Sequence, residues 1–235
     1  MFDFSGKVIV VTGAAGNLGR AVVTVFAEAG GIVCCLDHRH GRLSDIFSGD
    51  DEHLRFYEGI DITEREAMLE VGQRIHDDIG SVDVLVNTVG GFTMGERVDQ
   101  ISAETWKKMM DVNVISLLNA SATFVPGMLE AGSGKVVSIG SGASLKGGAK
   151  TGAYSATKGA VLRLTESMAA ELKASNIQVN CVLPGTIDSP ENRQAMPNAD
   201  FNKWVTPTQV AYAIAFLSSP GADAITGTAL PVTGG

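Results

Sequence analysis

Cysteine is scarce in this sequence, with three among 235 residues. Cys34 and Cys35 are adjacent and Cys181 stands alone, so the chain cannot build a disulfide framework. It also lacks the C-x-x-C spacing of a metal site. We therefore expect three buried thiols, a reducing cytoplasmic location and no bound metal.

Positive charge and long apolar runs are also in short supply. Lys and Arg number 18 against 26 acidic residues, so the formal net charge is −8, and no basic cluster offers a surface for nucleic acid. No run approaches the roughly 18 consecutive apolar residues of a membrane span. Residues 1–11 lack the cationic region and the length of a secretory signal. We expect no nucleic-acid partner and no membrane association.

Glycine is abundant, and short β-branched runs alternate with helical patterns. Strands are predicted at 8–11, 32–36, 82–86, 135–139 and 177–182, and helices at 18–30, 64–79, 102–130, 153–175 and 207–218. The alternation predicts a single α/β domain, residues 1–235, built on a doubly wound parallel sheet (a Rossmann fold) with helices on both faces. Ligands of such sheets bind beyond the carboxyl ends of the strands. The stretch near 186–206 has little periodicity and is interpreted as a substrate lid.

A glycine-rich loop joins the first strand to the first helix. Gly13, Gly16 and Gly19 stand where a tight turn and uncovered backbone N–H groups would let a pyrophosphate rest on a helix N-terminus. Asp37 ends the second strand, where a carboxylate accepts from adenosine ribose hydroxyls and repels a 2′-phosphate. This favours NAD over NADP. The neighbouring His38 and Arg39 leave the opposite choice open, because they could attract that phosphate.

Three polar residues are predicted to meet at the same end of the sheet. Tyr154 and Lys158 lie four apart on one helix face, and Ser141 follows the strand that ends at Ile139. A tyrosine with the ordinary pKa of about 10 is an inefficient general acid/base at neutral pH. A nearby ammonium and a cationic nicotinamide ring would favour the phenolate.

Over its length from Phe4 to Gly235 the chain resembles the short-chain dehydrogenase/reductase family. The resemblance rests on ordered motifs: the Thr12–Gly19 loop, Asp61-Ile62, Asn87-Thr88-Val89-Gly90, Asp111-Val112-Asn113-Val114, Ser141, Tyr154-x-x-x-Lys158 and Pro184-Gly185. It implies an NAD(P)-dependent oxidoreductase that transfers hydride between nicotinamide C4 and a carbonyl or secondary alcohol, such as a 3-oxoacyl group or a small ketone. It also implies a homo-oligomer, a dimer or tetramer, formed through the long helices.

The resemblance implies a role for each matching residue. Tyr154 would be the general acid/base, Lys158 would hold the nicotinamide ribose, Ser141 would bond the substrate oxygen, and Asn113 would sustain a helix irregularity and a proton relay. Cofactor contacts are implied, in addition to Tyr154 and Lys158, for Gly13, Gly16, Asn17, Leu18, Gly19, Asp37, Asp61, Ile62, Asn87, Gly90, Pro184, Gly185, Ile187 and Ser189.

Departures from the family pattern leave two further functions open. Asn17 replaces a usual glycine, although Asn tolerates a left-handed φ. Residues 187–204 and Gly90-Gly91-Phe92 are similar to dihydropteridine reductases, which use NADH to reduce a flat pterin ring but lack a serine at the position of Ser141. A non-catalytic nicotinamide-sensing protein is the other alternative, which the intact Tyr154, Lys158 and Ser141 disfavour.

Overall fold

The computed structural model describes residues 2–47 and 51–234. Met1 and Gly235, the two ends of the predicted domain, lie outside the described residues. The described chain forms a sheet of seven parallel strands in the order β3-β2-β1-β4-β5-β6-β7, as the doubly wound prediction requires. The strands are β1 (Val8–Thr12), β2 (Ile32–Asp37), β3 (Leu54–Glu58), β4 (Val84–Asn87), β5 (Gly134–Ile139), β6 (Ile177–Pro184) and β7 (Ala229–Val232).

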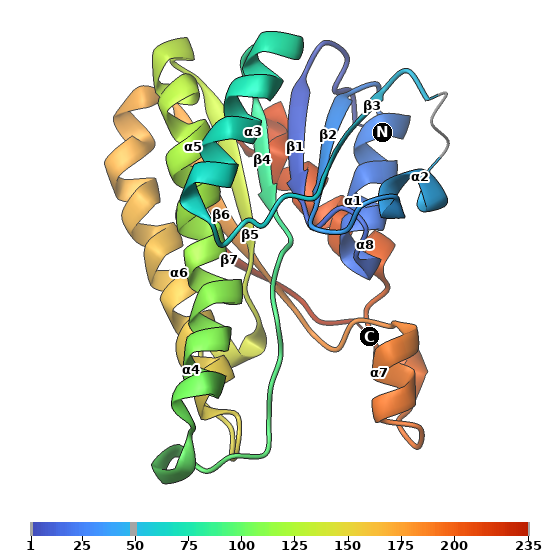
Figure 1. Ribbon diagram of the computed structural model, residues 1–235, viewed down its shortest axis with the longest axis vertical. Coiled ribbons are helices and arrows are strands. Elements are labelled where there is room, and N and C mark those ends of the chain that lie inside the picture. Colours follow the sequence, from blue (N-terminus) through green and yellow to red (C-terminus); the bar gives the residue numbers. More distant parts are fainter. Residues whose placement is uncertain (1, 48–50, 235) are drawn as a thin grey trace.

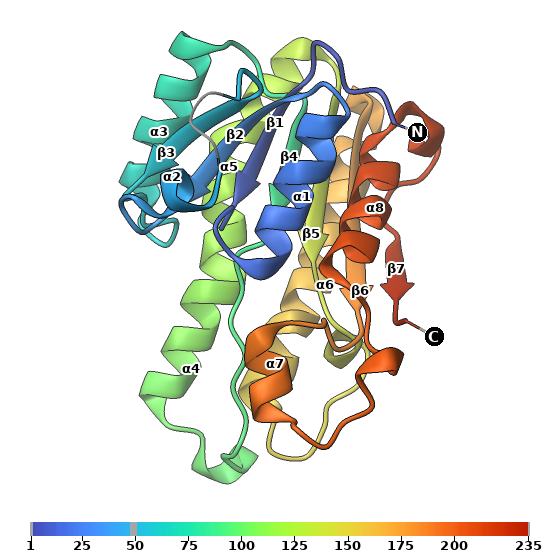
Figure 2. The same ribbon diagram turned by 90° about the vertical axis from the view of Figure 1, so that its right-hand side faces the viewer.

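Helices cover both faces of this sheet (Figures 1 and 2). One face carries α1 (Asn17–Glu28), α2 (Arg42–Ile46) and α8 (Pro207–Ser218), and the other carries α3 (Arg65–Asp78), α4 (Ala103–Met110), α5 (Ser116–Ala131) and α6 (Gly152–Leu172). Each face has its own apolar core, represented by Phe26 and Ile214 on the first and Met68 and Phe124 on the second. The strand residues between them are almost all buried, as their β-branched runs predict.

Four regions differ from the sequence-based expectation. Neither the strand β3 nor the short helix α2 was predicted from the sequence pattern. The helix predicted at 102–130 contains a π-turn, Asp111–Ile115, between α4 and α5. Within the lid, α7 (Pro190–Ala195) is helical, with Ser189 as its N-cap. β7 lies in the C-terminal run 225–235, where the family resemblance implies the last strand.

The long helical stretch α4–α5 also bears on the membrane expectation. Among the residues that the structure describes, Ala103–Ala131 is long and apolar enough, by length and composition, to cross a bilayer. Polar residues interrupt it, so it contains no long apolar run, and 56% of its most apolar window is buried in the protein. Packing of α5 against α3 and β5 accounts for this apolar character.

The strand order reverses between β1 and β4: β2 and β3 follow on one side of β1, and β4 to β7 follow on the other. β1 and β4 pair with each other in parallel. A reversal of this kind leaves a crevice at the carboxyl ends of the two strands. The loops that follow β1, β2, β4, β5 and β6 all lie at this end, together with the lid and α7 (Figure 2). A ligand site is therefore expected there.

Candidate active site

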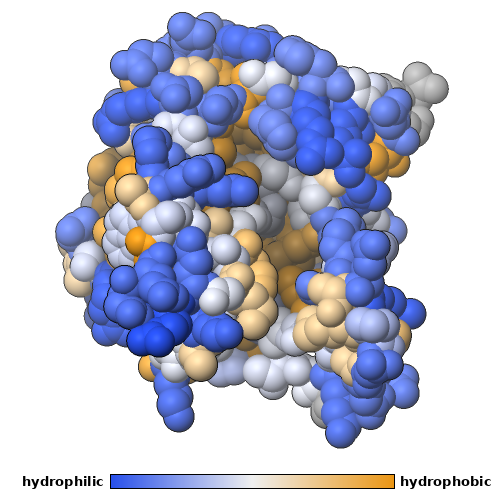
Figure 3. Space-filling view, turned by 60° about the horizontal axis from the view of Figure 1, so that its bottom comes forward, coloured by the Kyte–Doolittle hydropathy of each residue, from blue (hydrophilic) through white to orange (hydrophobic). Residues whose placement is uncertain are grey.

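The space-filling view shows a hollow at this end of the sheet, with hydrophobic side chains on its floor (Figure 3). A cavity of about 500 Å³ lies within the fold at the carboxyl ends of β1, β2 and β4. Of the predicted cofactor residues, its wall includes Gly13, Gly16, Asn17, Asp37, Asp61, Ile62 and Gly90. Its volume is in the range of small-molecule and cofactor pockets.

The glycine loop forms one wall of this cavity. Gly13 has φ +65°, a left-handed conformation that favours glycine, and Gly16 N donates to Gly13 O at 3.0 Å. A Cβ on Gly19 would collide with Gly13 O, so this glycine permits the close contact between the loop and α1. Leu18 points into the apolar core beneath the loop. The glycines thus allow a tight turn at Gly13 and close packing against α1 at Gly19, both of which a dinucleotide-binding loop requires.

Asn17 does not need the left-handed φ considered from the sequence. It is the first residue of α1, and the positive φ of the loop falls on Gly13 instead. Its side-chain Nδ2 donates to Glu191 Oε2 at 2.6 Å, across 174 residues of sequence. The departure from the usual glycine thus provides a bond between the cofactor loop and the lid helix α7.

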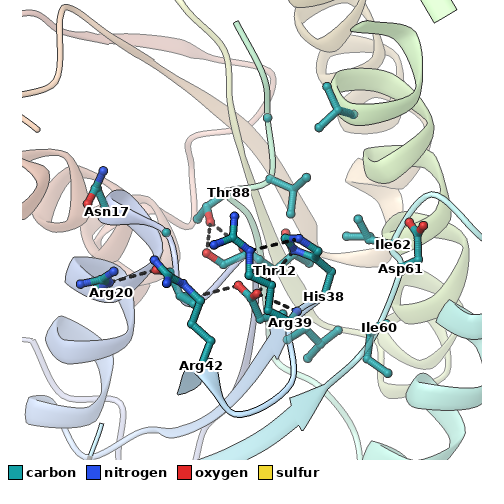
Figure 4. Close-up of a pocket in the computed structure, with 18 of the residues that line it drawn as sticks. Thr12, Asn17, Arg20, His38, Arg39, Arg42, Ile60, Asp61, Ile62 and Thr88 are labelled. Atoms are coloured by element: carbon teal, nitrogen blue, oxygen red, sulfur yellow. Dashed lines mark hydrogen bonds and ion pairs between the residues drawn. The ribbon is translucent and has the colours of Figure 1, made fainter. Parts of the chain in front are cut away.

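Asp37 ends β2 at the cavity wall, beside the glycine loop, and cationic side chains line the same cavity (Figure 4). Its buried carboxylate accepts from Ala15 N at 3.1 Å and Arg39 N at 3.2 Å. Arg39 and Arg42 line the same cavity. This end therefore offers a fixed acceptor for hydroxyl groups beside two guanidinium groups.

Asp61 and Thr12 give the cavity further polar groups. Asp61 Oδ1 accepts from Thr63 N at 2.9 Å and from Thr63 Oγ1 at 2.7 Å, and these bonds hold the pKa of Asp61 below its usual value. Thr12 lines the cavity, and its buried hydroxyl has no hydrogen-bond partner among the residues that the structure describes. A glycine cradle, an orphaned hydroxyl and acidic acceptors fit the phosphates and ribose hydroxyls of a dinucleotide.

Tyr154 and Ser141 meet at the carboxyl end of β5. Ser141 is the N-cap of the 3₁₀ turn Gly142–Ser144, and its hydroxyl accepts from Ala143 N at 3.2 Å. The Tyr154 phenol lies near the same hydroxyl. Burial raises the pKa of Tyr154 above its usual value, and the nearby Ser141 hydroxyl opposes the rise. The predicted stabilisation of the phenolate by Lys158 does not contribute to this shift.

Lys158 lies beside them on α6 and is 5% exposed. Burial lowers its pKa to about 8, because an ammonium is poorly solvated in the interior. Its Nζ donates to Ile139 O at 2.8 Å. The ammonium is thus held at the end of β5, and a Cβ on Gly90 would lie 3.0 Å from it.

Asn113 occupies the π-turn and is 2% exposed. Its Oδ1 accepts from Gly91 N at 3.0 Å, and its Nδ2 donates to Gly91 O at 3.1 Å. The helix irregularity expected from the resemblance is therefore present at this residue. It brings the carboxamide against the loop that follows β4.

Other predicted cofactor residues lie off the cavity wall. Asn87 is buried, and its Nδ2 donates to Ser138 Oγ at 3.2 Å across β4 and β5. Within the described part of the chain, its Oδ1 has no hydrogen-bond partner. Gly185 N donates to Val232 O at 2.9 Å, just after Pro184 ends β6. In these residues the structure shows strand-end links, and their cofactor roles stay predictions.

Ile187 and Ser189 belong to the base of the lid. Ile187 forms an isolated parallel bridge with Val205 and packs against the core beneath α1 and α8. The hydroxyl of Ser189 accepts from Asn192 N at 3.2 Å as the cap of α7. The structure therefore gives Ser189 a capping role in α7, and its implied contact with the cofactor stays a prediction.

Sequence reasoning missed two buried polar side chains beside the site. Thr157 accepts from Asn113 Nδ2 at 3.1 Å, and Asn119 Nδ2 donates to Ile62 O at 3.1 Å and Thr63 O at 2.9 Å. A polar side chain on the buried face of a helix signals a tertiary partner. That signal is available for Asn119, which lies in an apolar helical stretch.

Comparison with known proteins agrees with this geometry. Residues 7–200 match the family model described as short chain dehydrogenase. The chain belongs to the short-chain dehydrogenase family.

Two relatives of this short-chain dehydrogenase carry the names of different enzymes. It is 31% identical over 243 residues to the 3-oxoacyl-[acyl-carrier-protein] reductase FabG of Vibrio cholerae serotype O1, covering 99% of this chain and 98% of the relative. It is 31% identical over 242 residues to cis-4-hydroxycyclohexanecarboxylate dehydrogenase of Sinomonas cyclohexanicum, covering 99% and 97%. As an oxidoreductase of this family, the chain acts on a C=O or CH–OH group and binds NAD(P).

A solved structure, described as ElxO with NADP bound, superposes with a TM-score of 0.90 at 26% sequence identity. The match covers 97% of this chain and 98% of that one. The parallel sheet and its helices are therefore those of the short-chain dehydrogenase fold.

Proposed function

We propose that this short-chain dehydrogenase transfers hydride between nicotinamide C4 and a carbonyl or secondary alcohol substrate, such as a 3-oxoacyl group or a small ketone. The observation that carries the proposal is the Tyr154 phenol beside the Ser141 hydroxyl, with Lys158 buried one turn further along α6. This arrangement lies next to a cavity suited to a dinucleotide.

Each residue then has a distinct task. The bound nicotinamide supplies or accepts the hydride. Tyr154 donates a proton to the substrate oxygen during reduction, and Ser141 hydrogen-bonds that oxygen and holds it within reach of the phenol. Lys158 binds the nicotinamide ribose hydroxyls through its ammonium group. Asn113 holds the π-turn against the loop that follows β4.

For the cofactor we propose NAD in preference to NADP. Asp37 is buried, and two backbone N–H groups hold it at the ribose end of the cavity, where its charge would repel a 2′-phosphate. The guanidinium groups of Arg39 and Arg42 line the same cavity and would instead attract a 2′-phosphate. Titration with NADH and NADPH decides between them: tighter NADH binding that Asp37→Ser abolishes supports the proposal, and tighter NADPH binding by the unaltered protein rejects it.

A pterin reductase is the second candidate, and Phe92 is the observation that favours it. The Phe92 ring is 62% exposed and packs edge-on against Tyr154, with ring centroids 4.9 Å apart. An exposed aromatic ring beside the proton donor suits a flat substrate. Ser141, which that reaction does not require, favours the carbonyl substrate.

The deciding experiment measures NADH and NADPH oxidation with a β-keto thioester, simple ketones and aldehydes, and a quinonoid dihydropterin. Turnover of a carbonyl substrate that collapses in Ser141→Ala and Tyr154→Phe, with NADH binding retained, supports the first proposal. Pterin turnover that is insensitive to Ser141→Ala would favour the second. Cofactor binding without turnover of any substrate would support a nicotinamide-sensing protein.

We further propose a cytoplasmic homo-oligomer, a dimer or tetramer, with small-molecule substrates. The three cysteines are free and buried, which is consistent with a reducing compartment. Leu118 and Leu129 on α5 are 37% and 43% exposed and lie 11 residues apart, so they share one helix face that a second copy could cover.

A further inference from the structure

Thr157 is a buried hydroxyl within the catalytic helix that the mechanism above does not use. It lies on α6 between Tyr154 and Lys158 and is 0% exposed. Its hydroxyl donates to Tyr154 O at 2.9 Å and accepts from Asn113 Nδ2 at 3.1 Å. One side chain thus joins the backbone of the proton donor to the carboxamide in the π-turn.

These bonds determine which way the Asn113 carboxamide faces. Both N–H groups of its Nδ2 have acceptors, Gly91 O and Thr157 Oγ1, and its Oδ1 accepts from Gly91 N. Because the Thr157 hydroxyl proton is directed to Tyr154 O, Thr157 offers Asn113 only a lone pair. A flipped carboxamide would place its oxygen against two acceptors and its N–H groups against the Gly91 N–H.

The orientation matters because the Asn113 oxygen lies near the Lys158 ammonium. A Cβ on Gly90 would be 3.1 Å from Asn113 Oδ1 and 3.0 Å from Lys158 Nζ, so both atoms surround one point above this glycine. Gly90 lines the cofactor cavity. The carboxamide oxygen of Asn113 and the cation that binds the ribose in the proposed function therefore lie on the same side of Gly90.

We propose that Thr157 is a positioning residue of this enzyme: its hydroxyl fixes the Asn113 carboxamide with Oδ1 toward Lys158, and so aligns the Lys158 ammonium for the cofactor. The inference rests on the proposed function for the role of Lys158. The hydroxyl of Thr157 orients the Asn113 carboxamide, and the methyl group of Thr157 is not required.

Thr157→Val tests this proposal, because valine keeps the shape of threonine and removes the hydrogen bonds. Thr165→Val is the matched control: Thr165 is also fully buried on α6, and its hydroxyl donates to Val161 O at 2.9 Å, away from Asn113. Thr157→Ser keeps the hydroxyl and removes only the methyl group. The Kd for NADH, kcat, KM and Tm are measured for all three.

We expect Thr157→Val to lower kcat by about 10- to 100-fold, the scale on which a small misplacement of reacting groups slows an enzyme. The Kd for NADH should rise several-fold, whereas Thr157→Ser and Thr165→Val should stay near the original protein in both quantities. If Thr157→Val does not fold, Thr157→Cys offers a weakly bonding thiol for the same comparison.

Thr157→Val values equal to those of Thr165→Val would overturn the proposal, as would equal losses in Thr157→Ser and Thr157→Val. The Kd for NADH separates this inference from the proposed function. If no substrate is turned over while Thr157→Val alone weakens NADH binding, the catalytic proposal fails and the positioning role stands. If a carbonyl substrate is turned over and Thr157→Val changes neither the turnover nor the Kd for NADH, the positioning role fails and the catalytic proposal stands.

Discussion

At the residue scale, Lys158 shows how folding and binding place opposite demands on one group. Burial lowers its pKa to about 8, so a substantial fraction of the side chain is neutral only slightly above physiological pH. The proposed contact with ribose hydroxyls requires the charged form, which donates three hydrogen bonds. The cofactor should therefore raise the pKa that burial has lowered.

A pH dependence of cofactor binding follows. Because a ligand that prefers the ammonium takes up a proton when it binds above pH 8, NADH affinity should be greatest below pH 8 and fall as the pH rises through that value. With a pKa of about 8 in the free protein, we expect the Kd to increase by up to about 30-fold between pH 7 and pH 9.5, measured by fluorescence titration. Lys158→Arg stays charged throughout and should give a flat profile. An equal slope in that variant would assign the titration to another group.

The place of single site residues could be predicted from the sequence, but their hydrogen-bond partners could not. The positions of Ser141, Tyr154 and Lys158 in the sequence place them at one end of the sheet, and the structure brings them together. The partners of Asn87 and Thr157 could not be predicted, because each hydrogen bond spans more than forty residues. Local periodicity contains no information on which distant strand or helix supplies such a partner.

At the element scale, the interior of the sheet was easier to predict than its edge. β1, β2, β4, β5 and β6 are β-branched and buried on both faces, which makes them recognisable in the sequence. β3 lies at the edge, and its sequence, Leu54 to Glu58, mixes charged and aromatic residues, of which Phe56 and Glu58 are only partly buried and Arg55 is exposed. The π-turn was expected from family resemblance alone, because Asp111–Ile115 has no breaker that would mark it.

The link between α1 and α7 is expected to influence cofactor affinity. Glu191 lines the cofactor cavity, and its pKa lies below its usual value because of hydrogen bonds to its own backbone N–H and to Asn17, so it is charged at neutral pH. An anion at this position opposes the binding of a pyrophosphate at the α1 N-terminus. Glu191→Gln should therefore lower the Kd for NADH about two- to fivefold at low ionic strength, with a smaller gain in high salt. A weaker affinity in Glu191→Gln would show that Glu191 supports binding.

Close packing of the glycine loop against α1 predicts a contrast between two glycines. A Cβ at Gly19 would strike the backbone of Gly13 and Ala14, so Gly19→Ala should destabilise the protein by about 1–3 kcal/mol. Gly127 lies within α5 with open space around its Cα, so Gly127→Ala should stabilise it by about 1 kcal/mol. Urea unfolding of both variants measures the two changes. A stable Gly19→Ala would mean that the loop can move away from α1 at little cost.

At the scale of the whole molecule, the parallel sheet determines where all of the chemistry lies. Its reversal between β1 and β4 opens one crevice, and the loops after five strands converge on it. The fold and the place of the site could therefore be predicted from the alternation of strands and helices. The substrate could not, because Phe92, Leu145 and Met196 lie on exposed loop segments whose spacing in the sequence does not determine their arrangement in space.

The exposed apolar face of α5 predicts self-association. A 24.5 kDa chain that pairs through Leu118 and Leu129 should give a light-scattering mass of at least two chains at micromolar concentration. The double substitution Leu118→Asp and Leu129→Asp should shift that mass to one chain, because it places charge within an apolar contact. Leu69→Asp, which alters a 47% exposed leucine on α3, is the matched control and should leave the assembly intact. A mass of 24.5 kDa for the unaltered protein would reject the homo-oligomer. An assembly that survives the double substitution would instead move the interface to another face, such as that of Tyr212 and Phe216 on α8.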